Sequence, residues 1–457
     1  MARIGRNKKK RSSFPVFLIL FLMLAAGGGY VFLNYFEGEK PVIEADNLHA
    51  FLGKKTPLLV TFSDTKSGLR SISITLSQGD LSKTVLSKEF PKATQKSADG
   101  HRKETINVDI DIKALGLKDG EALLTINATD YSLRRLLKGN LSQLTHKVMV
   151  DTQAPKISII HSERYIQPGG AGIVIYTVDD SVRQGVVINN AFHPGFPLTD
   201  ESEKKFISYF AMPYDAKKLE TSFILAKDAA GNITEKPFST VVKKPRQKHD
   251  KINVTDGFLS KKIPEFESHY PEMNGSDSEK YLYANSTIRT MNNKKIHDLC
   301  MQPDSKRHWS GRFTRMAGSG KAGFADHRTY YYQGKAIDKQ VHLGMDIAST
   351  RHAPVKAAGT GKVIYSDYLG IYGNMVMIDH GQGVFSLYSH LSQSNVSPGD
   401  MLKQGDVLGN TGTSGMAGGD HLHFSMLVNG IFVTPKEWWD QHWIDVTIDG
   451  PVVDAKF

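Results

Sequence analysis

The stretch Gly418-Gly419-Asp420-His421-Leu422-His423-Phe424 places two imidazoles on either side of one apolar residue, directly after glycines. Side chains alternate between the two faces of a strand, so His421 and His423 would point to the same face. Two neutral imidazoles on one face can share a cation. Such a pair alone is weak evidence in a chain with 17 histidines. A second motif, His342-Leu343-Gly344-Met345-Asp346, adds a nitrogen and a carboxylate, and the two together predict a metal site.

The sequence around these motifs predicts a domain built almost wholly of antiparallel strands. Apolar and β-branched runs at residues 361–365, 375–378 and 384–388 predict strands, and glycines between them mark turns. We place this domain at residues 309–440, with a C-terminal extension at 441–457.

Further short motifs follow one another in this part of the chain: Pro354-Val355-Lys356-Ala357-Ala358, Gly361-Lys362-Val363, Tyr372-Gly373-Asn374, Asp379-His380-Gly381, Tyr388-Ser389-His390-Leu391, Gly399-Asp400, Gly405-Asp406 and Gly412-Thr413. With the two histidine motifs, they make residues 310–435 resemble the lysostaphin-like, LytM-type zinc endopeptidases of the peptidoglycan DD-endopeptidase family, which have a duplicated hybrid motif fold. The resemblance covers under a third of the chain.

The resemblance implies a zinc ion held by His342, Asp346 and His423, with His390 and His421 as unligated catalytic histidines. It also implies a cell-wall hydrolase that cuts peptide cross-bridges of peptidoglycan. Two nitrogens and one oxygen leave a tetrahedral zinc with an open fourth position, as in catalytic sites. Zinc there acidifies water and polarises a carbonyl. Since the chain has no His-Glu-x-x-His motif, one of the two unligated histidines is the available base and acid, and the other can stabilise the oxyanion.

Plainer interpretations remain for single residues. His342 and Asp346 could form a surface ion pair, His390 could be a core histidine, and His380 is expected in a turn. The chain also departs from the family where residues 414–424 are extended and Asp420 replaces a proline or neutral residue. Residues 324–328 match only part of a further family motif. These departures leave the cleavage preference open, but they do not affect the predicted metal ligands.

Two segments before this domain, residues 41–150 and 151–246, predict β modules. Alternating or β-branched runs at 58–62, 71–76, 157–160, 173–178 and 223–226 predict strands of antiparallel sandwiches. The second segment opens with Asp151-Thr152-Gln153-Ala154-Pro155, and its closing residues 226–232 are similar to residues 126–132, which suggests tandem repeats. Both segments resemble bacterial immunoglobulin-like modules. The expected role is a stalk; binding of cell-wall polymer, or of a divisome or cell-wall protein, is the alternative.

The N-terminus predicts a membrane anchor. Six Lys or Arg lie in the first eleven residues, without Asp or Glu, and the uncharged apolar stretch 14–36 follows. A stretch of roughly 20 apolar residues can cross a bilayer as a helix, and the basic tip, 1–13, would stay in the cytoplasm. The remaining chain would then lie outside the inner membrane, in the periplasm or beyond. A cleaved signal peptide and a buried core helix are the alternatives.

Composition narrows the function classes. Of the net charge of +10, six charges lie in the N-terminal tip, and no other basic cluster is interleaved with aromatics, which argues against nucleic acid. Residues 247–308 are expected to be a linker with a helical segment at 278–293. The sequence thus predicts a mainly β protein: a transmembrane helix, two immunoglobulin-like modules and a zinc peptidase acting on peptidoglycan stem peptides or cross-bridges. A catalytically inactive activator of cell-wall amidases, or a surface-binding protein acting through its β modules, is the alternative.

Overall fold

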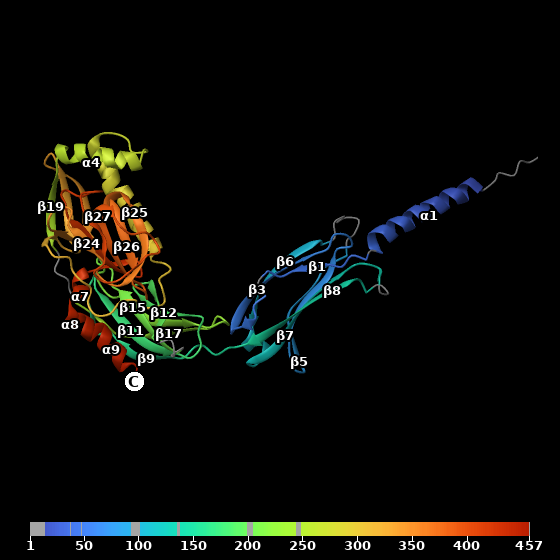
Figure 1. Cartoon of the computed structure of the whole chain (residues 1–457). Helices are drawn as coiled ribbons and strands as arrows, with labels where there is room; N and C mark the ends of the chain where they lie inside the picture. Colours follow the sequence, from blue (N-terminus) through green and yellow to red (C-terminus); the bar gives the residue numbers. More distant parts are fainter. Residues whose placement is uncertain are drawn as a thin grey trace, which may run out of the picture. The chain divides into compact units, whose positions relative to one another are not determined.

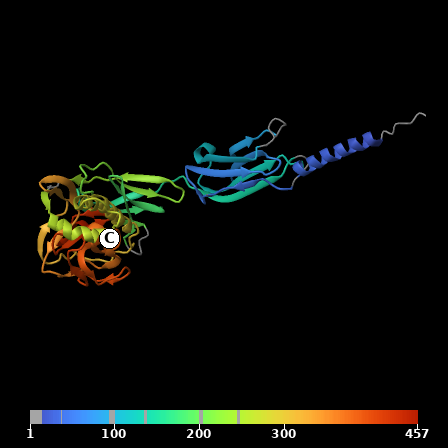
Figure 2. The ribbon, with the colours of Figure 1, turned by 90° about the horizontal axis from the view of Figure 1, so that it is seen from above.

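The structure is a computed structural model that describes residues 14–36, 38–46, 48–92, 101–134, 138–198, 204–243 and 248–456. The chain forms two compact units (Figures 1 and 2). It is mainly β, as the sequence predicts. The basic tip 1–13 and residues 244–247 lie outside the described residues.

The first unit comprises Met1–Ala154 and Ala229–Asn232. Its elements are α1 (Phe14–Tyr35), β1 (Val42–Glu44), β2 (Phe51–Leu52), β3 (Lys55–Ser63), β4 (Leu69–Gln78), β5 (Leu81–Glu89), β6 (Lys103–Asp111), α2 (Ile112–Leu115), β7 (Gly120–Asp130) and β8 (Leu141–Val150). The apolar stretch at the N-terminus is thus helical. Within the described residues, however, no helix is long and apolar enough to cross a membrane, so the predicted span is not confirmed.

Two sheets make up the β part of this unit. Their strand orders are β1-β3-β6 and β2-β8-β7-β4-β5. Burial alternates along β3, where Leu58, Val60 and Phe62 point into a core shared with Ile72 and Ile74 of β4. One buried and one exposed face per sheet is the arrangement that alternating strands favour. The predicted sandwich is therefore present, while its immunoglobulin-like character stays a prediction.

The second unit comprises Pro155–Asp228 and Ile233–Phe457. Its N-terminal β segment contains β9 (Ile157–Ser162), β10 (Tyr165–Ile166), β11 (Ala171–Val178), β12 (Arg183–Ile188), β13 (Ala191–Pro194), β14 (Phe196–Pro197), β15 (Lys205–Ala211), β16 (Ser222–Lys227), β17 (Ile233–Pro237) and β18 (Val241–Val242). Two four-stranded sheets result, in the orders β14-β15-β11-β9 and β13-β12-β16-β17.

A strand and three helical segments follow, where the sequence suggests a linker: β19 (His249–Val254), α4 (Asp256–His269), α5 (Asp277–Tyr283) and, after a π-helical turn at Ala284–Ile288, α6 (Arg289–Leu299). Thr255 and Ser276 cap α4 and α5 through hydrogen bonds to the backbone N–H groups of Phe258 and Glu279. The strand β19 pairs in parallel with β21 (Asp326–Tyr332), which pairs with β22 (Lys335–His342). This segment is therefore an ordered part of the second unit.

The rest of the chain forms the large sheet β20-β23-β30-β27-β26-β25-β28 and its additions. Its elements are β20 (Ser319–Ala322), β23 (Met345–Ala348), β24 (Pro354–Lys356), β25 (Gly361–Tyr368), β26 (Asn374–Asp379), β27 (Val384–Ser394), β28 (Met401–Leu402), β29 (Val407–Thr411), β30 (Leu422–Val428), β31 (Ile431–Val433), α7 (Pro435–Trp439), α8 (Gln441–Ile444) and α9 (Gly450–Asp454). Each recorded pairing within it is antiparallel, as predicted.

Both faces of this sheet are covered. Met375 and Met377 of β26 pack against the helical segments α4–α6, whereas Val376 and Ile378 of the same strand face a second core. The second core also contains Tyr209 of β15, together with Trp309 and Trp438. The N-terminal β segment of this unit therefore shares one core with the C-terminal sheet and with α7–α9 (Figure 1).

Candidate metal centre

Two sheets bring the predicted metal ligands together. His342 ends β22, Asp346 lies in β23 and His423 lies in β30. Asp346 and His423 face each other directly in the antiparallel register of β23 and β30. Because Leu422 and Phe424 point into the core shared with the N-terminal β segment, His423 points to the opposite face of the sheet.

The three side chains converge on one point and are buried. Nε2 of His342 and Nδ1 of His423 each lie 2.9 Å from Oδ1 of Asp346, and the two nitrogens lie 3.0 Å apart. A glycine makes this approach possible, because a Cβ at Gly344 would lie 2.5 Å from Nε2 of His423.

Hydrogen bonds on the far side of each ring fix the tautomers. Nδ1 of His342 donates to the carbonyl oxygen of Gly323, at 2.8 Å. Nε2 of His423 lies 3.1 Å from Oγ of Ser425, whose own hydrogen goes to the carbonyl of Leu343. In their neutral forms both rings would turn a lone pair toward the carboxylate oxygen. Three acceptors that meet without a donor between them form a site that could hold a cation, and the nitrogen and oxygen atoms fit zinc.

Electrostatics favour the ligating forms. Burial acts to raise the pKa of Asp346, but the imidazoles of His342, His421 and His423 hold it well below its ordinary value. Burial lowers the pKa of His423 to about 4. A deprotonated carboxylate and a neutral imidazole are the forms that bind a metal ion.

Arg328 of β21 bonds to the same carboxylate from the other side. Its Nη2 lies 3.2 Å from Oδ2 of Asp346, so Oδ1 is left for the metal. The sequence singled out residues 324–328 only as an incomplete family motif, and the pairing of β21 with β22 is what places this guanidinium.

The two predicted catalytic histidines lie next to this cluster. Their ring centroids are 4.9 Å apart, and that of His390 is 5.7 Å from that of His423. Nδ1 of His390 donates to the carbonyl oxygen of Ser414, and Nδ1 of His421 donates to that of Gly419. Nε2 of His421 lies 3.6 Å from Oδ1 of Asp346. With Nδ1 of each ring occupied, Nε2 is the atom left for chemistry, and in His421 this atom already lies beside the carboxylate of Asp346.

The environments of these two rings differ. Burial, followed by the neighbouring imidazoles, holds the pKa of His390 well below its ordinary value. For His421, burial acts to lower the pKa, but the hydrogen bond and charge of Asp346 raise it above the ordinary value. His390 is thus biased toward the neutral form and His421 toward the cation, a division that suits one base and one acid.

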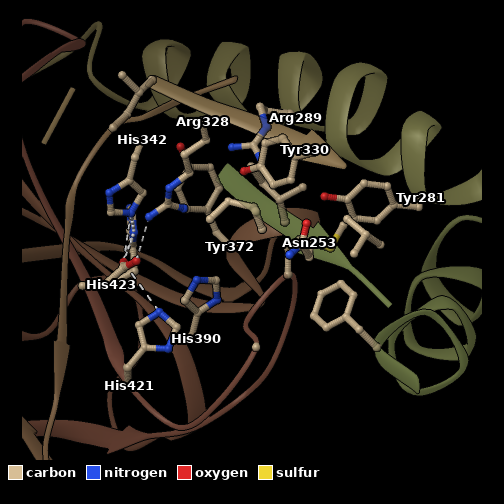
Figure 3. Close-up of a pocket in the computed structure, with 18 of the residues that line it drawn as sticks. Asn253, Tyr281, Arg289, Arg328, Tyr330, His342, Tyr372, His390, His421 and His423 are labelled. Atoms are coloured by element: carbon tan, nitrogen blue, oxygen red, sulfur yellow. Dashed lines mark hydrogen bonds and ion pairs between the residues drawn. The ribbon is translucent and has the colours of Figure 1, made fainter. Parts of the chain in front are cut away.

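A pocket of about 460 Å³ lies in front of these histidines. Figure 3 shows His390 and His421 on one side of it and Tyr281 and Arg289 on the other. Asn253 of β19 also lines it. The side facing the sheet comes from residues 252–289, where sequence reasoning found no chemistry. A run such as Tyr281-Leu282-Tyr283 gives no sign of a distant pocket, so no local signal could have found this wall.

Other residues weighed from the sequence lie outside the cluster. His380 is buried, with Nδ1 bonded to the carbonyl of Thr360 and Nε2 to Ser386, as expected for a structural residue. Tyr388 is also buried. Asp420 does not line the pocket; it accepts hydrogen bonds from Oγ1 of Thr411 and from the backbone N–H of His352. The extended loop meets the pocket through Gly418 instead.

Comparison with known proteins agrees with this geometry. The family model described as Peptidase family M23 matches residues 340–435, which hold the five site residues named above. DD-carboxypeptidase/endopeptidase Mpg of Neisseria meningitidis is 38% identical over 96 residues, which are 21% of this chain and 22% of that protein. Peptidoglycan DD-endopeptidase ShyC of Vibrio cholerae is 38% identical over 97 residues, again 21% and 22%.

Murein hydrolase activator EnvC of Escherichia coli is 36% identical over 95 residues, which are 21% of this chain and 23% of that protein. The chain therefore spans less than a quarter of the length of these relatives. Among solved structures, one described as a peptidase M23 from Pseudomonas aeruginosa covers 59% of this chain and 92% of its own at 20% identity, with a TM-score of 0.36. The catalytic domain of lysostaphin from Staphylococcus simulans covers 26% and 90% at 28% identity, with a TM-score of 0.23. The C-terminal part of the chain thus carries a peptidase M23 domain.

Proposed function

We propose that this protein is a zinc metalloendopeptidase that hydrolyses peptide cross-links of peptidoglycan. The observation that carries the proposal is the convergence of His342, Asp346 and His423 through three acceptor atoms, next to two more imidazoles that line the same pocket and whose Nδ1 atoms are held by backbone carbonyls. A structural site would surround the metal with protein ligands, whereas this one opens onto a pocket.

The residues around the pocket suit amide hydrolysis. When bound, zinc supplies Lewis-acid chemistry that acidifies water and polarises a carbonyl. A water that attacks an amide must lose a proton, and the leaving amine must gain one. Nε2 of His390 or of His421 can take the first proton and deliver the second, because Nδ1 of each ring is held by a backbone carbonyl. The ring that is protonated can also donate to the oxyanion.

The relatives support peptidoglycan as the substrate. Two of them are named as endopeptidases, one of them of peptidoglycan. The similarity to a murein hydrolase activator favours a second candidate, a protein that stimulates a separate hydrolase without cutting bonds itself. We prefer the enzyme because all five site residues are present and all five line one pocket.

The full-length chain, purified and incubated with peptidoglycan sacculi, tests the proposal. We expect about one zinc per chain and release of muropeptides whose masses identify a cleaved peptide bond. His342→Ala and His423→Ala should abolish both zinc binding and release, whereas His442→Ala, at an exposed position on α8, should change neither. A wild-type protein that holds no zinc and releases nothing, yet stimulates an added amidase, would establish the activator instead.

We also propose that residues 14–36 anchor the protein in the inner membrane and that the peptidase domain acts outside the cytoplasm. The support is the order of a basic tip and an uncharged apolar stretch, together with the exposed apolar side chains of α1 such as Phe17 and Leu24. Alkaline extraction of membranes and protease treatment of spheroplasts test this. Release of the protein into the soluble fraction on alkaline extraction would contradict the proposed membrane anchor. The β segments are proposed to hold the domain within the wall or to bind a divisome or cell-wall protein.

A further inference from the structure

The wall of the pocket opposite the histidines lies outside the matched family region and carries its own charge. Arg289, the first residue of α6, lines the pocket together with Tyr281 of α5 (Figure 3). The buried contacts of Phe266, Ile288 and Ile296 with the sheet hold these helices in place. Arg289 is therefore presented to the pocket by a fixed element.

One edge of the Arg289 guanidinium forms hydrogen bonds with Asn285, one turn earlier in the same helical segment. Its Nε donates to the backbone carbonyl of Asn285, 2.9 Å away, and its Nη2 donates to the side-chain oxygen of the same residue. Asn285 is fully buried, and its own amide donates to Asp338. These bonds fix the direction of the guanidinium. Among the described residues, Nη1 has no hydrogen-bond partner and no carboxylate forms an ion pair with this arginine.

The charges that line the pocket do not balance. Its lining contains two guanidiniums, of Arg289 and Arg328, and one carboxylate, of Asp346. Arg328 already bonds to that carboxylate, so no carboxylate of the lining is left for Arg289, and Asp338 is linked to it only through Asn285. A bound metal ion would add positive charge. Tyr281 is buried and its ring packs against Tyr330, with centroids 6.2 Å apart. These rings exclude water from one side, which strengthens any ion pair formed there.

We propose that Arg289 binds a carboxylate of the peptide substrate, so that the pocket selects peptides with a free carboxylate close to the cleaved amide over uncharged bridges such as polyglycine. A guanidinium with one fixed edge and one free edge is suited to a carboxylate, since charge-assisted bonds from arginine are strong and directional. This inference rests on the proposed peptidase function and names the substrate class of that site.

Two synthetic peptides that differ only in one group test the inference. One carries a free carboxylate on the residue beside the cleaved amide, and the other carries a carboxamide there. For the zinc-loaded full-length chain, we expect kcat/KM to be roughly tenfold or more higher for the carboxylate peptide. Arg289→Gln should bring this ratio close to one, and Arg289→Lys should leave an intermediate ratio because it keeps the charge without the planar fork.

The ratio separates recognition from folding, since a merely structural defect lowers cleavage of both peptides alike. Lys294→Gln is the matched control: it removes one positive charge from the same helix, but Lys294 is exposed and paired with Asp298. It should keep the wild-type ratio. A wild-type ratio near one, or an Arg289→Gln ratio equal to that of the wild type, overturns the inference.

Binding to the chelator-treated full-length chain, measured by calorimetry, distinguishes this failure from failure of the proposed function. The carboxylate peptide should bind more tightly than the carboxamide peptide, and Arg289→Gln should remove the difference. If neither peptide is cut but this difference is present, the peptidase proposal fails while the carboxylate site stands. If both are cut at equal rates and bind equally, only the carboxylate site is rejected.

Discussion

Arg328 and Asp346 share one hydrogen bond across the edge of the metal centre: Nη2 of the arginine lies 3.2 Å from Oδ2 of the carboxylate, while Oδ1 faces the two imidazoles. The carboxylate is thereby held so that one oxygen is reserved for a cation. A group that orients a metal ligand in this way contributes to affinity without touching the metal.

Replacing this arginine should therefore weaken metal binding. We expect Arg328→Gln to lower the affinity for zinc by roughly 10- to 100-fold, as is typical for partners that orient ligands. Competition with a chromophoric chelator measures this. Arg315→Gln is the control, because its guanidinium bonds to the backbone carbonyls of Met316 and Gly318 and lies over the ring of Trp439 instead of contacting Asp346. Equal zinc affinities for Arg328→Gln and the wild type would show that the ion pair does not orient the ligand.

The two histidines beside the cluster should separate metal binding from turnover. His390→Ala and His421→Ala remove rings whose Nε2 atoms face the pocket but leave the three converging acceptors in place. We expect zinc content near that of the wild type and a loss of turnover of roughly 100-fold or more, the range for general acid–base groups. Elemental analysis and a peptide cleavage assay measure the two. Loss of zinc in either variant would mean that its ring is a ligand.

A hydrogen-bonded contact from α4 should affect turnover through His390. Oε1 of Glu265 accepts from the backbone N–H of Gly415, at 2.5 Å, and Lys262 donates to the carbonyl of Thr413. These bonds hold the segment whose Ser414 carbonyl orients His390. We expect Glu265→Ala to lower kcat with little change in KM or zinc content, and to cost roughly 1–3 kcal/mol of stability.

Two further variants test this positioning role. Glu265→Gln keeps an acceptor and should restore much of kcat. Glu267→Ala, on the same helix α4, breaks a salt bridge with Lys280 of α5 and should leave kcat unchanged. A Glu265→Ala enzyme with wild-type kcat would show that His390 does not depend on this contact.

Glu437 of α7 should make stability depend on pH. It accepts hydrogen bonds from the backbone N–H of Ala171 and from Nε2 of Gln167, and burial raises its pKa to about 7. The folded form thus binds a proton that the unfolded chain releases near pH 4.5, so stability is full below that pH and is lost as pH rises through 7. The free energy of unfolding should fall by about 3 kcal/mol over this range.

Denaturant unfolding of the wild type and of Glu437→Gln at several pH values between 4 and 8 checks this. The variant cannot ionise at this position. The free energy of unfolding of the wild type, relative to that of the variant, should therefore fall as pH rises from 4 to 8. Parallel pH profiles would mean that Glu437 has an ordinary pKa in the folded state.

The sequence predicted strands of the C-terminal sheet because they depend on local pattern, whereas the candidate metal ligands were named through the resemblance to a family. Short continuous apolar runs locate β26 and β27, and the spacing of His421 and His423 predicts that both face one side of the sheet. His342 and His423 are far apart in the sequence, so no local pattern predicts that they meet. That prediction came only from the resemblance to a family.

The other wall of the pocket could not be predicted from the sequence. Asn253, Tyr281 and Arg289 are ordinary residues of a strand and two helices, and their position depends on the parallel pairing of β19 with β21 and on packing of α6 against the sheet. Neither leaves a local signature. The same holds for Glu437, a charged residue near the C-terminus whose partners lie some 270 residues earlier.

β15 shares a hydrophobic core with Trp309 and Trp438. This shared core determines the shortest fragment of the chain that we expect to fold independently. A chain cut just before β19 would lack Ile207, Tyr209 and Ala211. The apolar surface of the C-terminal sheet that these residues cover would then be exposed to solvent. The boundary of an independently folding catalytic fragment therefore lies near Pro155, well before the matched family region begins. A fragment that keeps the peptidase domain folded therefore has to keep residues 155–228 and 233–243, which belong to the same compact unit.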